Sequence, residues 1–241
     1  MRLFYLPDVR FHEADAIALP QELRHHLATV LRLGPGAAVQ LFDGQGRVAE
    51  ARLLADGRAE LSRVRTCPPP ACRMTLIQGL PKGDKTELIL QKGTELGVSG
   101  FHLVAMERSV GRFKQHVRQQ QRREKIIQEA ARQCYQYHLP TLVNSDSLAA
   151  ALAEDEADLK LLLWEESTTA LPQVLDRAAP RRISLIVGPE GGISEKEAAA
   201  ARAQGYQSVR LGPRILRTET AGLAMIAVLQ YLYGDLAIGP G

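Results

Sequence analysis

The spacing of apolar positions divides the chain into two parts. Up to residue 66, apolar and polar residues alternate in short runs, and Asp-Gly pairs at 43–44 and 56–57 separate three of these runs. Alternation predicts half-buried β-strands, and Asp-Gly pairs favour hairpin turns. Helical spacing over 21–33 predicts one helix. The predicted strands cover residues 2–6, 37–42, 46–54 and 58–64, so this part is expected to be a small β-rich unit.

From residue 73, predicted strands and helices alternate along the chain, which is typical of an α/β fold with a mostly parallel sheet. Apolar runs predict strands at 74–80, 100–106, 159–164, 183–187 and 209–211. Helical patterns predict helices at 84–96, 118–135, 147–153 and 219–233, and another that begins at 194. Three consecutive prolines predict a stiff connector. The predicted domains are therefore 1–66 and 73–241, joined by a linker at 67–72.

Residues that are typical of helix N-termini mark the start of several of these predicted helices. Ser194 followed by Glu197, and Asp84 followed by Glu87, are typical of capping boxes. Thr218 is expected to cap the last helix. That helix is apolar nearly all round, which predicts that it is buried on two sides or pairs with a partner.

Two of the predicted strands end in Gly-Pro turns. Residues 183–187 run into the sequence GPEGG at 188–192, and residues 209–211 run into the turn at 212–213. Because α/β proteins bind ligands at the carboxyl ends of their strands, these turns are candidates for a ligand site. The first turn lacks the features of a P-loop or a dinucleotide fingerprint, and its Glu190 suits hydroxyls, amines or a positive centre. From these residues alone, a small-molecule pocket and a structural turn both remain open.

Composition narrows the class of protein. The formal net charge of +3 over 241 residues is mild, so the distribution of charge matters more than its total. The three cysteines give one C-x₄-C spacing without a second pair, which is poor for zinc, and no metal site is expected. No signal peptide is recognised at the N-terminus, and no apolar run nears the ~18 residues of a membrane span. A cytoplasmic protein without membrane contact is therefore expected.

Basic residues gather in the middle of the chain. The stretch contains Arg112, Lys114, Arg118, Arg122, Arg123 and Lys125. A basic stripe of this kind can neutralise the phosphates of a nucleic acid, although most charge runs are solvated helix faces. His25 and His26, on the predicted first helix, allow the same two interpretations.

Two motifs near the carboxyl terminus resemble the signature pair of a known family. GPEGGISEKE at 188–197 and LGPRILRTETAGLA at 211–224 are similar to motifs of the RsmE family, the SPOUT-class methyltransferases that methylate N3 of a uridine in 16S ribosomal RNA. The resemblance extends upstream, in order and over nearly the whole chain. The further matching stretches are HHLATVLRLGPG at 25–36, LPKGDKTELILQKGTELGV at 80–98, ERSV at 107–110 and EAARQC at 129–134.

The resemblance implies a fold and a cofactor. It implies a PUA-like RNA-binding β-barrel at the amino terminus, followed by a SPOUT domain that contains a trefoil knot. It also implies that S-adenosylmethionine binds in the knot between three loops. The implied cofactor-binding residues are Leu162, Leu163, Trp164, Gly188, Pro189, Glu190, Gly191, Gly192, Leu211, Gly212, Pro213, Leu216, Arg217, Thr218 and Glu219.

The implied partners are 16S ribosomal RNA or the small ribosomal subunit, and a second copy of the chain bound through the carboxyl-terminal domain. The expected RNA-binding residues are His25, His26, Arg32, Arg112, Lys114, Arg122 and Arg123. The chain departs from the family after EAARQC, where the stretch Tyr135-Gln136-Tyr137-His138 follows in place of the usual small and basic pair. These tyrosines either stack on RNA bases or belong to the core, and the sequence leaves both possibilities open.

Methylation of uridine N3 requires that the proton on this nitrogen be removed or displaced. The always-charged guanidinium of Arg217 would favour the deprotonated base, and Arg108 is a second candidate for that role or for a phosphate contact. Glu190, Glu219 or water would accept the proton. Two other functions remain open: a SPOUT methyltransferase that acts on another RNA position, such as a ribose 2′-hydroxyl, and a non-catalytic RNA-binding protein.

Overall fold

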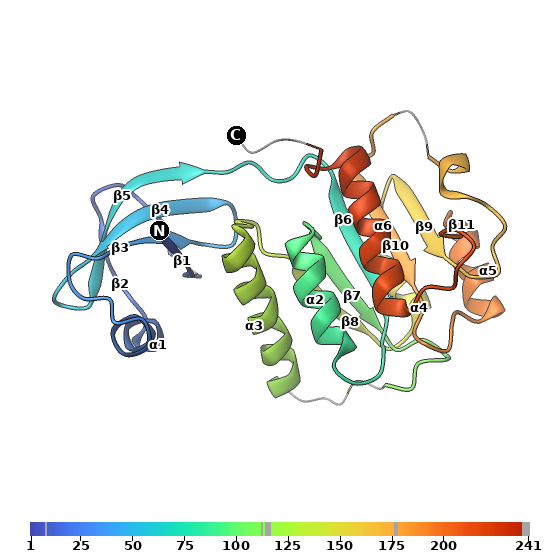
Figure 1. Ribbon diagram of the computed structural model, residues 1–241, viewed down its shortest axis with the longest axis horizontal. Coiled ribbons are helices and arrows are strands. Elements are labelled where there is room, and N and C mark those ends of the chain that lie inside the picture. Colours follow the sequence, from blue (N-terminus) through green and yellow to red (C-terminus); the bar gives the residue numbers. More distant parts are fainter. Residues whose placement is uncertain (8, 112, 114–116, 176–177, 238–241) are drawn as a thin grey trace. The chain divides into compact units, whose positions relative to one another are not determined.

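The structure is a computed structural model that describes every residue except 8, 112, 114–116, 176–177 and 238–241. The chain forms two compact units. Met1–Pro69 and Ala131–Leu139 make up the first unit, and Pro70–Ala130 and Pro140–Gly241 make up the second. Each unit has a β-sheet and a hydrophobic core of its own (Figure 1).

The first unit is built around a five-stranded sheet in the order β1-β3-β4-β5-β2. The strands are β1 (Arg2–Tyr5), β2 (Ala16–Ala18), β3 (Ala38–Phe42), β4 (Arg47–Leu53) and β5 (Arg58–Thr66). β1 pairs parallel with β3, and the other neighbouring strands pair antiparallel. The short strand β2 was not predicted. The predicted first helix is shorter than expected, because α1 (Gln21–His25) continues only as a π-helical turn, η1 (His26–Val30).

The second unit is built around a six-stranded sheet in the order β11-β9-β10-β6-β7-β8. Its neighbouring strands all pair parallel, which confirms the predicted α/β class. The strands are β6 (Arg73–Gly79), β7 (Gly100–Val104), β8 (Thr141–Ser145), β9 (Leu159–Leu163), β10 (Arg182–Val187) and β11 (Gln207–Val209). β8 was not predicted, because it is an edge strand whose residues are mostly polar and exposed.

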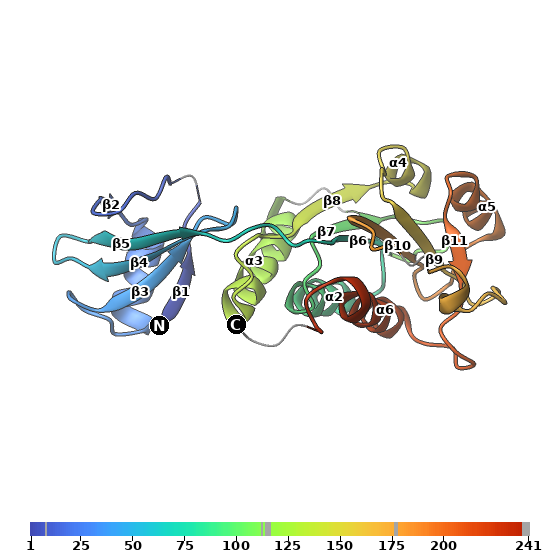
Figure 2. The same ribbon diagram turned by 90° about the horizontal axis from the view of Figure 1, so that it is seen from above.

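Helices cover both faces of this parallel sheet. They are α2 (Lys85–Glu95), α3 (Val117–Cys134), α4 (Leu148–Leu152), η2 (Leu171–Gln173), α5 (Glu195–Ala203) and α6 (Thr218–Tyr233). Figure 2 shows α2 and α6 on one face and α4 and α5 on the other. Leu162 and Ile186 pack in a core cluster with Ala198 of α5. The next residue of β10, Val187, points to the other face and approaches Gly222 of α6.

The end of α3 and the loop after it belong to the first unit, although they follow almost the whole of α3 in the sequence. Ala131 is fully buried in a cluster with Leu3 and Phe42. The ring of Tyr137 lies 6.4 Å from the ring of Phe42. Tyr137 is therefore a partly buried aromatic residue that packs against the core, whereas Tyr135 is 51 % exposed.

One of the predicted capping boxes forms and the other does not. The Ser194 hydroxyl accepts a hydrogen bond from the Glu197 peptide N–H, and the Glu197 carboxylate accepts one from the Ser194 peptide N–H. Asp84 occupies the cap position of α2 but makes no side-chain cap hydrogen bond. The prediction is wrong for α2 because Glu87 forms an ion pair with an arginine of α3 instead.

Among the described residues, none of the helices combines the length and apolar character that a membrane span requires. In that same part of the chain, no group of three or more His, Cys, Asp or Glu side chains is placed to hold a metal ion. The three cysteines are free thiols, and burial raises the pKa of the Cys72 thiol to about 11.

Candidate functional site

A cavity of about 390 Å³ lies at the carboxyl ends of three neighbouring strands. Leu163 of β9, Val187 of β10 and Val209 of β11 hold matching register positions there and line the cavity. The first Gly-Pro turn, the residues on either side of the second, the start of α6 and Lys85 of α2 complete the lining. The volume falls within the range of roughly 300–1,000 Å³ that is usual for small-molecule sites. The two turns singled out in the sequence therefore meet at one pocket.

Most residues predicted to bind a cofactor line this cavity. They are Leu163, Trp164, Gly188, Pro189, Glu190, Gly192, Leu211, Leu216, Arg217 and Thr218. The predicted residues that do not line it are Leu162, Gly191, Gly212, Pro213 and Glu219. Leu162 is excluded because it points to the opposite face of the sheet from Leu163. The carbonyl groups of Gly212 and Pro213 are instead held by Arg210, whose guanidinium donates to each at 3.2 Å.

Several lining residues were not among the predicted site residues. They are Lys85, Glu165, Val187, Val209, Arg210, Arg214, Ile215 and Ala221. Arg214 and Ile215 lie inside the LGPRILRTET motif, so the motif itself was the signal that could have found them. Lys85 lies in the matching stretch LPKGDKTELILQKGTELGV, which was the signal for it, although a lysine at the start of a helix has no spacing pattern of its own.

Gly188 must lack a side chain because the chain folds back tightly after β10. A Cβ atom at this position would lie 2.6 Å from the Ile193 side chain and 3.1 Å from the Gly192 backbone. Real Cβ contacts are longer than this, so any larger residue would push the turn out of place. A glycine at this position is therefore required by the packing of the protein itself, beside the cavity that Gly188 lines.

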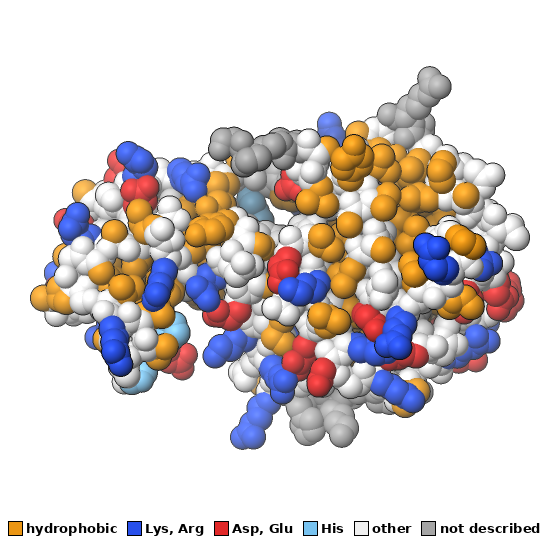
Figure 3. All heavy atoms as spheres, viewed as in Figure 1, with side chains coloured by type: hydrophobic (Ala, Val, Ile, Leu, Met, Phe, Trp, Pro, Cys, Tyr) orange, Lys and Arg blue, Asp and Glu red, His pale blue; other side chains and the backbone are white. Residues whose placement is uncertain are grey.

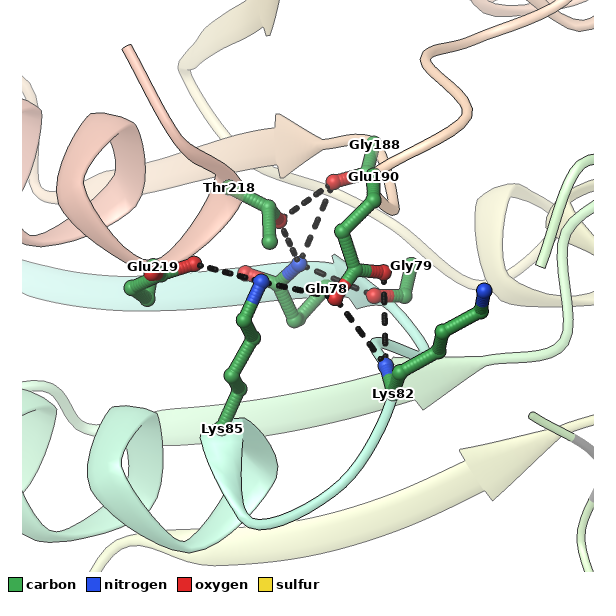
Figure 4. A network of polar contacts seen from close by, with 8 residues as sticks. All are labelled: Gln78, Gly79, Lys82, Lys85, Gly188, Glu190, Thr218 and Glu219. Atoms are coloured by element: carbon green, nitrogen blue, oxygen red, sulfur yellow. Dashed lines mark hydrogen bonds and ion pairs between the residues drawn. The ribbon is translucent and has the colours of Figure 1, made fainter. Parts of the chain in front are cut away.

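Thr218 joins the start of α6 to the end of β10 (Figure 4). Its hydroxyl donates to the carbonyl oxygen of Gly188 at 2.5 Å and accepts from Nε2 of Gln78 at 2.8 Å. The cap position of α6 belongs to Arg217, and no side chain caps this helix. The prediction that Thr218 caps α6 is therefore wrong, because its hydroxyl bonds to neighbouring strands instead.

Lys85 brings together the two carboxylates predicted to take part in catalysis (Figure 4). Its ammonium lies 2.9 Å from Glu190 and 3.4 Å from Glu219. The Lys82 peptide N–H also donates to the Glu190 carboxylate. Partial burial raises the pKa of Glu190, but Lys85 and the neighbouring peptide N–H groups outweigh it and hold this pKa below its usual range. The hydrogen bond to Glu190 raises the pKa of Lys85, so at neutral pH Glu190 is ionised and Lys85 is protonated.

The two arginines predicted to take part in catalysis have different surroundings. Arg217 lines the cavity and is exposed to solvent. Arg108 does not line it, and its guanidinium donates to the carbonyl oxygen of Gly191 at 3.3 Å. The neighbouring Glu107 accepts a hydrogen bond from the Ser194 hydroxyl at 2.7 Å. The ERSV stretch therefore supports the first turn from outside the cavity, and Arg217 is the better placed of the two for contact with a substrate.

Trp164 lines the cavity beyond the end of β9. The guanidinium of Arg202 lies 5.1 Å from the centre of the indole ring, which fixes this ring from one side. The indole N–H is buried and has no hydrogen-bond partner among the described residues. Because a buried unpaired donor is unfavourable, this N–H is a candidate contact for a polar ligand.

Of the predicted RNA-binding residues, His25, His26 and Arg32 are exposed on the first unit. The backbone of Arg32 is left-handed, with φ of 53°. Arg112 and Lys114 lie outside the described residues. The two histidines therefore lie on a solvated helical segment, which was one of the two interpretations of the sequence. Their exposure is also compatible with the other interpretation, contact with RNA.

The two neighbouring arginines of α3 behave differently. Arg122 is exposed but pairs with Glu87, whose carboxylate lies 2.7 Å from its guanidinium. Arg123 is only 6 % exposed, and its guanidinium lies 5.9 Å from the Phe113 ring. Burial lowers the pKa of Arg123. The prediction that Arg123 is part of an exposed basic stripe is therefore wrong, because this side chain packs inward.

Comparisons with known proteins assign the family. A family model described as an RNA methyltransferase domain matches residues 68–230, and one described as an RNA methyltransferase PUA domain matches residues 19–61. The ribosomal RNA small subunit methyltransferase E of Mycobacterium bovis is 34 % identical, over 95 % of this chain and 91 % of the relative. The chain belongs to the ribosomal RNA small subunit methyltransferase E family. The Bacillus subtilis member is 31 % identical, over 92 % of each chain.

Solved structures of this family share the fold. The crystal structure of the Neisseria gonorrhoeae enzyme, bound to S-adenosyl methionine, is 34 % identical and has a TM-score of 0.88, over 98 % of this chain and 99 % of the other. A Legionella pneumophila structure in complex with the same cofactor is 28 % identical and has a TM-score of 0.87, over 97 % of this chain and 98 % of the other. These matches confirm the resemblance to the RsmE family and the predicted SPOUT and PUA-like architecture.

Proposed function

We propose that this protein transfers a methyl group from S-adenosylmethionine to N3 of a uridine in 16S ribosomal RNA. Membership of the methyltransferase E family supports the reaction, and the cofactor bound to the Neisseria gonorrhoeae relative supports the methyl donor. Within this chain, the observation that carries the proposal is the cavity at the ends of β9, β10 and β11, lined by the first Gly-Pro turn and by the residues on both sides of the second. A cytoplasmic location, as the sequence predicts, would place the enzyme with its RNA.

The residues around the cavity fit S-adenosylmethionine. Leu163 and Leu216 offer apolar surface for the adenine ring, and the indole N–H of Trp164 is an unpaired donor. Glu165 supplies negative charge that suits a ligand with a sulfonium and an ammonium group, whereas the charge of Glu190 is paired with Lys85. When bound, the cofactor supplies a methyl group that its sulfonium activates. Gly191 would support the site from behind the lining residues, through its contact with Arg108.

The chain's own residues must hold the uridine and dispose of its N3 proton. Arg217 is exposed beside the cavity, and its permanent charge would stabilise the deprotonated base. Glu190 is a weak proton acceptor because its pKa is held low. We infer that Glu219 or water accepts the proton, and that Glu190 holds Lys85 at the site. Arg108 would act by supporting the first turn.

RNA contact is proposed for exposed basic residues in each unit. His25, His26 and Arg32 are exposed on the first unit, within the residues that match the PUA model. In the second unit, Arg214 and Arg217 are exposed at the cavity. Such contacts predict RNA affinity that falls with added salt, because phosphate binding releases counterions.

We also propose that the protein forms a homodimer through the second unit. Figure 3 shows apolar side chains gathered over α6. On this helix Val228, Tyr231 and Leu232 are exposed, and Tyr231 reaches 64 %. An apolar helix face that its own subunit leaves uncovered is typical of an interface. Light scattering after gel filtration, with Tyr231→Glu as the disrupting variant, tests this proposal.

The experiment that tests the function compares 16S ribosomal RNA from cells with and without the gene. Nuclease digestion followed by mass spectrometry should show one methyluridine lost in the deletion strain and restored by the intact gene. Primer extension should stop at that uridine only when it is modified, because a methyl group on N3 blocks base pairing. A lost ribose 2′-O-methyl group would identify a different methyltransferase. Unchanged RNA, together with no S-adenosylmethionine binding, would identify a non-catalytic RNA-binding protein.

A further inference from the structure

Gln78 is a fully buried polar residue directly behind the cavity. It lies near the end of β6, pairs in register with Val187 of β10, and does not line the cavity itself. Its Nε2 lies 2.9 Å from the Gly79 carbonyl oxygen, 2.8 Å from the Thr218 hydroxyl and 3.4 Å from the Gly188 carbonyl oxygen (Figure 4). One amide group therefore contacts the ends of two strands and the first residue of α6.

The orientation of this amide follows from its neighbours. The carbonyl oxygens of Gly79 and Gly188 can only accept hydrogen bonds, so the amide nitrogen and not the amide oxygen must face them. The Thr218 hydroxyl donates to Gly188, which leaves its lone pair to accept from Gln78. The result is a directed chain of hydrogen bonds from Gln78 through Thr218 to Gly188, and reversing it would place acceptors against acceptors.

This chain of hydrogen bonds fixes two segments that line the cavity. Gly188 begins the first turn, and Thr218 begins α6 after the second turn. Close packing adds to the restraint, because a Cβ atom on Gly79 would lie 2.5 Å from the Pro189 ring. The two turns are far apart in sequence, and the described contacts between the ends of β6 and β10 and the start of α6 hold them together.

We propose that Gln78 is a positioning residue for the methyl donor: through Thr218 it holds Gly188 and the start of α6 at the separation that S-adenosylmethionine binding requires. The proposal rests on the proposed function, since it concerns the same cavity. Gln78 does not touch the ligand and acts through the two residues that do. Gln78 thereby determines the fraction of protein molecules in which the cavity has the geometry that cofactor binding requires.

Two substitutions of Gln78 test this role by different routes. Gln78→Glu keeps the shape but places a carboxylate against two carbonyl oxygens, and Gln78→Met keeps most of the volume but removes the donor. If either change leaves only about one molecule in ten with the turns correctly placed, the apparent Kd for S-adenosylmethionine rises about tenfold. Calorimetry measures this Kd, and steady-state assays should show KM for S-adenosylmethionine rising more than KM for RNA.

A second pair of variants keeps the test decisive if Gln78 variants fold poorly. Thr218→Ser retains the hydroxyl and should bind S-adenosylmethionine more tightly than Thr218→Val, which loses it. Thr94→Val is the matched control, because Thr94 is also buried and donates to the carbonyl oxygen of Leu90 within α2, away from the cavity. This control should lower the melting temperature without changing the Kd.

The possible results separate this inference from the proposed function. If the unaltered protein does not bind S-adenosylmethionine, the proposed function fails. If it binds, but Gln78→Met and Thr218→Val bind as tightly as the unaltered protein and only melt earlier, like Thr94→Val, the positioning role is wrong. A Kd about tenfold higher in these variants, with an unchanged Kd in the control, supports it.

Discussion

The two turns that meet at the cavity are built in opposite ways. In the first turn, Gly188 and Pro189 are buried, and the space for a side chain at Gly188 is already filled by protein. In the second turn, residues 212–215 are exposed, Ile215 is 81 % exposed, and a Cβ on Gly212 would meet nothing within 4 Å. The first turn is therefore fixed by packing before any ligand arrives.

The contrast suggests that the two turns have different roles within one site. A turn that is packed and hydrogen-bonded on its inner side can define the position of a cofactor at little cost in conformational entropy. An exposed turn with basic residues such as Arg214 and Arg217 is suited to meet a larger substrate. Substitutions in the first turn should therefore affect cofactor binding most, and substitutions in the second should affect the RNA step most.

The largest effect is expected from Gly188→Ala. The added methyl group would meet Ile193 at 2.6 Å and the Gly192 backbone at 3.1 Å, so the turn must shift. Calorimetry should show S-adenosylmethionine affinity falling by about a hundredfold or more, with a loss of stability of about 1–3 kcal/mol from overpacking. Gly212→Ala is the matched control: its φ of 64° costs about 1–2 kcal/mol, but no atom obstructs the new methyl group. Equal loss of affinity in both variants would remove the distinction between the turns.

Arg217→Ala should give the next largest effect, and it should appear in turnover. Loss of one positive group that stabilises charge in the transition state typically lowers kcat by about 10²-fold. Binding of S-adenosylmethionine should change much less, because Arg217 is an exposed residue at the cavity. Arg217→Lys should recover part of the activity. Unchanged kcat at saturating substrates would exclude Arg217 from the reaction.

Arg210→Ala should have a smaller effect on the same turn. Its guanidinium holds the carbonyl groups of Gly212 and Pro213. Hydrogen bonds from charged groups contribute about 1.5–3 kcal/mol when well formed and less when exposed. We expect KM for RNA to rise roughly threefold to tenfold, with little change in melting temperature. A rise confined to KM for S-adenosylmethionine would show that the second turn serves the cofactor instead.

The smallest effect is expected from Glu190→Gln, and it should appear as a lower melting temperature. Because the pKa of Glu190 is lowered, its contribution is present above the unfolded-state value of about 4.3 and is lost as pH falls through the folded-state pKa. The pKa of Lys85 is raised, so its contribution is lost only as pH rises through a value above about 10.4. The difference in melting temperature from the unaltered protein should be constant between about pH 6 and 9 and should shrink on both sides.

A matched variant separates this effect from general surface charge. Glu156→Gln removes an exposed ion pair with Arg182, away from the cavity. It should lower the melting temperature by less than Glu190→Gln at neutral pH, because exposed pairs contribute little. If the two variants behave alike across the pH range, the Lys85 cluster has no special role in stability.

Short sequence patterns correctly predicted those elements whose structure is determined by residues close to them in the sequence. The strand end at Val187, the capping box at Ser194 and most lining residues follow from short stretches of chain, whereas the strand predicted at 209–211 is β11 at Gln207–Val209. The signals failed where a distant partner decides the outcome. Thr218 looks like a cap but bonds to Gly188, and Arg123 lies in a charge run but is buried against Phe113.

The boundaries of the two units also could not be predicted fully from local sequence patterns. A contiguous first domain ending at residue 66 is the simplest interpretation of the proline stretch, yet Ala131–Leu139 packs with that unit. Ala131 and Tyr137 carry no local sign that they belong there, because partners such as Leu3 and Phe42 are far away in the sequence. The implied trefoil knot stays a prediction for the same reason, since threading of the chain leaves no periodic pattern.

The most direct test of the account is a crystal structure of the protein with S-adenosylmethionine or its demethylated product. The account predicts the ligand in the cavity between the two turns, with its adenine against Leu163 and Leu216 and the backbone of Gly188 in contact. The Gln78–Thr218–Gly188 hydrogen bonds should be intact behind it. A ligand bound elsewhere, or in this cavity with Gly188 and Thr218 separated, would contradict the account.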